Sequence, residues 1–189
     1  KPGRATASSV DLDLTLTSGP YAFPVLVRAG YKFVGPRGLV FQQVGDVLYN
    51  PGETVKTTVP YTQIETLSVK YNSTGAARQR FELRSIDTGK YVAQGSLVVY
   101  VNGELWTETD FLPFDSLNQY EVNYEAEPPY VKFGDGIVGN VPAVNAEVSI
   151  SYGVTKGRAG NGVQPNTIKI PGVLLMVGFQ TISLSASHA

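Results

Sequence analysis

Residues 134–139 read GDGIVG, three glycines in the spacing G-x-G-x-x-G with one carboxylate between them. Placed after a strand and before a helix, such glycines hold the pyrophosphate of a dinucleotide against free backbone N–H groups. Here a strand-like run precedes the glycines, but Pro142 follows them and residues 146–154 alternate with period two. Without a helix there is no array of free N–H groups for phosphate. The pattern therefore predicts a turn between two strands, with Gly134, Gly136 and Gly139 supplying positive φ angles.

Asp135 could also be read as a calcium ligand, but calcium takes roughly six to eight oxygen ligands and one acid cannot supply them. We expect its carboxylate to accept hydrogen bonds from N–H groups of the turn instead. Acid pairs elsewhere resemble the two carboxylates of glycoside cleavage. They are Asp11 with Asp13, Asp110 with Asp115, and Glu125 with Glu127. Nothing in the sequence separates them from surface acids, so we assign no catalytic residue, no cofactor and no metal ligand.

Overall composition narrows the function further. The 189 residues include 15 basic and 16 acidic side chains, no cysteine, and a single histidine, His188, near the end. Near-neutral charge disfavours a nucleic-acid partner. The lack of cysteine removes disulfides and thiolate chemistry, and a histidine at a chain end cannot be held rigidly in a catalytic triad. No apolar run approaches the ~20 residues of a membrane-spanning helix. These observations predict a protein that is not an enzyme.

Apolar and polar residues alternate with period two in several segments, which is typical of strands with one wet face. The clearest are residues 10–16, 67–71, 120–124 and 148–154. Asn102-Gly103, between two β-rich runs, predicts a type I′ hairpin turn. Only residues 114–119 leave room for a short helix. We therefore predict a mainly β fold of antiparallel, β-sandwich-like sheets with hairpins and little helix.

Turn-rich segments suggest how the chain is divided. A cluster of turn residues near 87–95 predicts a boundary between a β-rich subdomain over 1–92 and a hairpin-rich subdomain over 93–156. The glycine, asparagine and proline of residues 157–167 predict that 157–189 is an extended linker or tail. Most tyrosines and phenylalanines fall on the apolar positions of strands, and Trp106 follows the hairpin, so packing is the expected role of the aromatic residues.

Two long segments carry a family resemblance. They are LVVYVNGELWTETDFL, which begins at Leu97, and YEVNYEAEPPYVKFGDGIVGNVPAVNAEVSISYGVTKGRAGN, which begins at Tyr120. With earlier segments in the same order, they resemble the baseplate J-like family of phage tail proteins over roughly residues 1–165. The positions that fall on the family's pattern are Trp106, Gly134, Asp135, Gly136, Gly139, Pro142, Gly157, Gly160 and Asn161. Arg28 and Asn145 depart from it, standing where the family has proline and glycine.

The resemblance implies a structural component of a baseplate wedge in a contractile tail. Its partners would be other copies of itself and other wedge or tail proteins. Its location would be the virion, and the host cytoplasm during assembly. It also implies a central fragment of a longer chain. The alternative, which the residues leave open, is a carbohydrate-binding or adhesin-like β domain that recognises a cell surface.

Overall fold

The computed structural model describes residues 6–84, 86, 89–115, 117–157, 167–168, 170–171, 175–177, 180–182 and 184–187. The predicted mainly β, largely antiparallel fold is confirmed. The chain forms two compact units. The central unit comprises Thr66–Val154 with Lys1–Thr6, and the terminal unit comprises Ala7–Glu65 with Thr155–Ala189.

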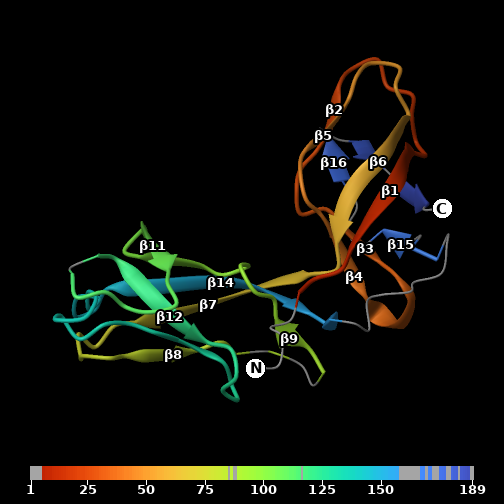
Figure 1. The fold of residues 1–189 in the computed structure, drawn as a ribbon. Helices are drawn as coiled ribbons and strands as arrows, with labels where there is room; N and C mark the ends of the chain where they lie inside the picture. Colours follow the sequence, from red (N-terminus) through yellow and green to blue (C-terminus); the bar gives the residue numbers. More distant parts are fainter. Residues whose placement is uncertain are drawn as a thin grey trace. The chain divides into compact units, whose positions relative to one another are not determined.

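The terminal unit is built on a six-stranded sheet with the order β15-β3-β4-β6-β1-β18. Its longest strands, β1 and β6, lie side by side and antiparallel (Figure 1). The strands of this sheet are β1 (Ser9–Leu16), β3 (Lys32–Val34), β4 (Val40–Gln43), β6 (Val55–Thr62), β15 (Ile170–Pro171) and β18 (Leu184–Ser187). Two small sheets pair β2 (Val25–Val27) with β5 (Val47–Tyr49) and β16 (Leu175–Val177) with β17 (Gln180–Ile182). One short 3-10 turn, η1, spans Pro36–Gly38.

The alternating pattern of β1 directs one face of that strand into the core of the terminal unit. Leu12, Leu14 and Leu16 are buried, whereas the intervening Asp13 and Thr15 lie on the other face. Asp13 also has a structural role, because its Oδ1 accepts a hydrogen bond from the N–H of Thr58 at 3.1 Å. Thr58 has a φ of +59°, and the register of β1 and β6 shifts nearby. Asp13 thus satisfies a backbone group at a β-bulge.

The central unit is an eight-stranded sheet with the order β7-β14-β10-β11-β12-β13-β8, in which β9 also pairs with β14. Its strands are β7 (Glu65–Asn72), β8 (Arg80–Glu82), β9 (Tyr91–Val92), β10 (Val98–Val101), β11 (Glu104–Glu108), β12 (Gln119–Asn123), β13 (Tyr130–Lys132) and β14 (Glu147–Thr155). Strands β11 and β12 pair in parallel, and the long segment 109–118 connects them. The tyrosine OH of Tyr71 on β7 donates to the carbonyl of Glu82 on β8 at 2.6 Å, which brings the two outermost strands together.

The division of the chain differs from the one predicted from turn residues. The expected seam at 92/93 lies within one sheet, because β9 and β10 both pair with β14. Residues 184–187, expected to belong to a linker or tail, form β18 and pair with β1. The described residues between 114 and 119 form bends and the start of β12 in place of the short helix. Pairing between distant segments cannot be read from local turn composition, which explains all three differences.

Candidate functional site

The glycine-rich segment 134–140 is a closed turn in which every backbone N–H is hydrogen-bonded, five within the segment and two to carbonyls of the preceding loop. The pairs are Gly134 N to Asn140 O, Asp135 N to Val138 O, Gly136 N to Gly139 O, Ile137 N and Val138 N to Asp135 Oδ1, Gly139 N to Pro113 O, and Asn140 N to Leu117 O. Phosphate binding by a glycine loop requires N–H groups that point outward and are unpaired. Within these seven residues no backbone N–H is available, and the segment is followed by loop and then strand β14. The geometry is that of a structural turn.

Gly136 and Gly139 have the predicted positive φ angles, whereas the same prediction was wrong for Gly134, which is required for close backbone approach. A Cβ on Gly134 would lie 2.2 Å from the carbonyl oxygens of both Val138 and Gly139, far inside contact distance. Gly136 has open space around it but a φ of +90°. Gly139 combines a φ of +69° with a close neighbour, since its Cβ would lie 2.9 Å from Cδ2 of Leu112. Close backbone approach and left-handed φ angles both favour glycine.

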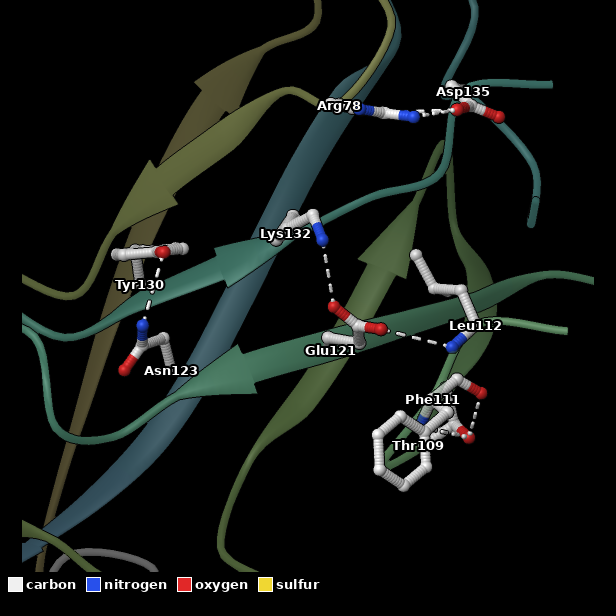
Figure 2. Close-up of polar contacts among 9 residues, drawn as sticks. All are labelled: Arg78, Thr109, Phe111, Leu112, Glu121, Asn123, Tyr130, Lys132 and Asp135. Carbon is white, nitrogen blue, oxygen red and sulfur yellow. Dashed lines mark hydrogen bonds and ion pairs between the residues drawn. The ribbon is translucent and has the colours of Figure 1, made fainter. Parts of the chain in front are cut away.

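The carboxylate of Asp135 is the centre of the turn. Its Oδ1 accepts from the N–H groups of Ile137 at 3.0 Å and Val138 at 2.8 Å. Its Oδ2 accepts from Nε and Nη2 of Arg78 at 3.0 and 2.8 Å, and Figure 2 shows the two side chains facing each other. The N–H of Val138, then the Arg78 side chain and then the N–H of Ile137 lower the pKa of Asp135 from 3.8 to about 2. The acid therefore occupies the position that an anionic ligand would need.

This charge state gives a prediction for acid stability. A folded-state pKa below the unfolded value means that the ionised form stabilises the fold above pH 3.8, and that this stabilisation is lost as the pH falls toward about 2. We expect Asp135→Asn to lower the Tm at pH 7. The difference in Tm from the wild type should shrink as the pH falls from 3.8 toward about 2. Circular dichroism melts across this range measure it. Arg78→Gln is the matched variant, and its effect should not add to that of Asp135→Asn. A difference that stays constant down to pH 2 would contradict the assignment.

A second loop, residues 109–118, lies against the glycine turn. The carbonyls of Pro113 and Leu117 accept hydrogen bonds from the turn at 2.9 and 3.3 Å. Figure 2 shows Glu121 on β12 between two partners from different elements: its Oε1 accepts from the N–H of Leu112 at 3.0 Å, and its Oε2 pairs with Nζ of Lys132 on β13 at 3.0 Å. The glycine turn and this loop thus form one hydrogen-bonded end of the central unit.

The hairpin and the tryptophan lie in the same sheet. Asn102 and Gly103 have φ angles of +49° and +81° and join β10 to β11. The Oδ1 of Asn102 accepts from the N–H of Glu147 on β14 at 2.8 Å, which attaches the turn to the next strand. Trp106 is buried and packs edge-on against Phe133, with ring centroids 5.1 Å apart. Its Nε1 is buried without a hydrogen-bond partner among the described residues.

The other described positions compared with the family's pattern also act through backbone hydrogen bonds or backbone conformation. The carbonyl of Pro142 accepts from Oγ of the buried Ser73 at 2.8 Å. Gly157 has a φ of +53°, and its N–H donates to Oγ1 of Thr155 at 3.1 Å. Asn145, where the family has glycine, has a φ of +63°, a conformation that asparagine adopts more readily than most residues. Gly160 and Asn161 lie outside the described residues.

Of the acids that the sequence left open, two have roles in the backbone structure. Asp13 accepts a hydrogen bond at the β-bulge, and Oδ1 of Asp115 accepts one from the N–H of Leu117 at 3.4 Å. Among the described residues no group of three or more histidine, cysteine or acidic side chains is placed to hold a metal ion. No helix in the described part of the chain is long and apolar enough to cross a membrane.

Sequence reasoning missed Arg78 and the loop 109–118. Arg78 has a φ of +56° and directs its guanidinium to Asp135, far from it in the sequence. The loop had a signal of its own, the apolar run FLPF between two aspartates.

Comparison of the chain with models of known protein families and with curated proteins finds no match.

Proposed function

We propose that this chain is a non-enzymatic structural component of a phage tail baseplate wedge, which assembles around the tail tube and helps to transmit the contraction signal. The observation that carries the proposal is the closed glycine turn. A loop that binds its own carboxylate and uses all its own N–H groups builds a rigid shape and offers no anion site. A structural part requires such a shape.

The positions shared with the baseplate J-like pattern support the same proposal, because they determine backbone geometry. Gly134 permits a close backbone contact, Gly136 and Gly139 have left-handed φ angles, and Pro142 accepts a hydrogen bond from a buried serine. Asn145 adopts the left-handed conformation at the position where the pattern has glycine. A pattern of this kind preserves a fold and assigns no residue to a chemical reaction.

Four tyrosines are not available to the alternative, a carbohydrate-binding surface. Aromatic rings that stack on sugars must be exposed, and Tyr49, Tyr61, Tyr120 and Tyr152 are fully buried, whereas Tyr91 and Tyr100 are exposed. Burial raises the pKa of Tyr61 and Tyr120, in keeping with hydroxyls removed from water. These four residues stabilise the two cores.

Co-expression of the full chain with the other tail proteins of its own virion tests the proposal. The expected result is incorporation into multimeric assemblies, measured by analytical ultracentrifugation and seen as rings or wedges by electron microscopy. The same protein is applied to a glycan array in parallel. Glycan binding without assembly would replace the wedge with the adhesin-like alternative.

A further inference from the structure

The most exposed large apolar side chains of the described chain gather at the hydrogen-bonded end of the central unit. Phe114 is 86% exposed, Phe111 is 84% and Ile137 is 75%. Leu117, on the same loop as the two phenylalanines, is 49% exposed. The two loops that carry these residues are joined by the bonds from the glycine turn to Pro113 and Leu117. We call Phe111, Phe114, Leu117 and Ile137 the apolar tip.

The loop that carries the two phenylalanines is anchored on both sides. Oγ1 of Thr109 donates to the carbonyl of Phe111 at 2.9 Å, and the N–H of Leu112 is bonded to Glu121, which Lys132 holds in turn (Figure 2). The carbonyl of Pro113 is bonded to the glycine turn. An aromatic side chain presented on an anchored backbone loses less conformational freedom on binding, which favours affinity.

The surroundings of the apolar tip are acidic. Residues 104–118 contain Glu104, Glu108, Asp110 and Asp115, and neither lysine nor arginine. Of the cations on adjacent segments, Lys132 and Arg78 are each paired with a carboxylate, and Arg80 lies over the ring of Tyr130. Negative charge around exposed phenylalanines disfavours insertion into an anionic lipid surface, which attracts basic segments. It favours a protein partner with basic side chains around an apolar pocket.

We propose that the apolar tip inserts into an apolar pocket with a lysine- or arginine-rich rim on a different protein. Buried aromatic anchors of this kind dominate binding energy in protein interfaces. A buried aromatic side chain contributes about 150–250 Å², so two of them supply at most roughly two-thirds of the ~800 Å² that each partner buries in a stable interface. The neighbouring acids and loop backbone must provide the rest. The inference does not depend on the wedge proposal, because it concerns the chemistry of the pocket and not the identity of the partner.

Site-specific photocrosslinking of the full chain locates the partner. Benzoylphenylalanine replaces Phe114 in cells that make the proteins of the chain's own genome, and Val44, 59% exposed in the terminal unit, is the control position. We expect position 114 to give one dominant crosslink, mapped to an apolar pocket with basic residues at its edge. Crosslinks no stronger than those at position 44, or crosslinks to a second copy of this chain or to lipid, would overturn the proposal.

Binding of the purified crosslinked protein then measures the contribution of the tip. The double variant Phe111→Ser/Phe114→Ser should weaken the Kd at least about tenfold, as expected for two anchor residues. Val44→Ser/Leu48→Ser, exposed apolar residues of the terminal unit, should leave the Kd unchanged. Asp110→Asn/Asp115→Asn should weaken binding about two- to tenfold and reduce its salt dependence. Unchanged affinity in the phenylalanine variant, with an unchanged unfolding curve from Trp106 fluorescence, would refute the proposal. A partner that is not a tail protein would refute the wedge assignment alone.

Discussion

Gly134→Ala is expected to lower the free energy of unfolding of the central unit by about 3 kcal/mol or more, at the upper end of the usual cost of overpacking. The added Cβ would lie 2.2 Å from two carbonyl oxygens of the same turn, Val138 O and Gly139 O. Both belong to backbone, which cannot rotate away as a flexible side chain does. The turn must open, and the bonds from Asp135 to its N–H groups are lost with it.

Urea denaturation followed by the fluorescence of Trp106, the single tryptophan, measures this loss in the central unit. Gly136→Ala is the matched control. It lies two residues away with nothing within 4 Å of the new Cβ, so only the left-handed φ of +90° opposes it. The cost there should be about 1 kcal/mol. Equal effects of the two substitutions would show that backbone approach at Gly134 is not the constraint.

Trp106→Ala should have an effect of similar size, about 3–5 kcal/mol, as is typical for removal of a buried tryptophan. Trp106 is 6% exposed and contacts Phe133, which in turn packs against Phe81 at 5.6 Å between ring centroids. Loss of the indole leaves a cavity in the middle of this aromatic group. Circular dichroism during urea denaturation measures the change.

Trp106→Phe separates the effect of aromatic ring packing from the effect of the buried Nε1–H at the same position. Phenylalanine keeps an aromatic ring against Phe133 and removes the buried Nε1–H, which has no hydrogen-bond partner among the described residues. Removal of an unsatisfied buried donor offsets part of the lost packing, because such a group costs about 1–3 kcal/mol. We expect Trp106→Phe to be clearly more stable than Trp106→Ala. Equal destabilisation by the two variants would contradict the packing role assigned to the aromatic ring at this position.

The leucines of β1 and the Asn102-Gly103 turn show what local sequence patterns can predict. Alternation over residues 10–16 places Leu12, Leu14 and Leu16 in a core, because side chains of a strand alternate between its two faces. Asn102-Gly103 adopts the two positive φ angles of a tight hairpin turn, a property of those two residues themselves. Both features depend on neighbours within a few positions, so the sequence alone was sufficient to predict them.

Distant pairings could not be predicted in this way. Residues 184–187 join β1 across most of the chain length, and β11 pairs in parallel with β12. Arg78 pairs with Asp135, 57 positions away, and has a left-handed backbone conformation that no motif indicates. These contacts depend on which strands become neighbours, and many pairings satisfy the same alternating pattern.

What the sequence by itself determined is the class of the fold and the turn chemistry of the glycine segment, because both follow from local conformational preference. Tertiary structure alone decided that Arg78 pairs with the Asp135 carboxylate, which the sequence had predicted to accept hydrogen bonds from the turn. It also decided that loop 109–118 is held beside it, with Phe111 and Phe114 facing solvent. The physical reason is that hydrogen-bond satisfaction and exposure are properties of neighbours in space. They can be known only when strands distant in sequence have been brought together.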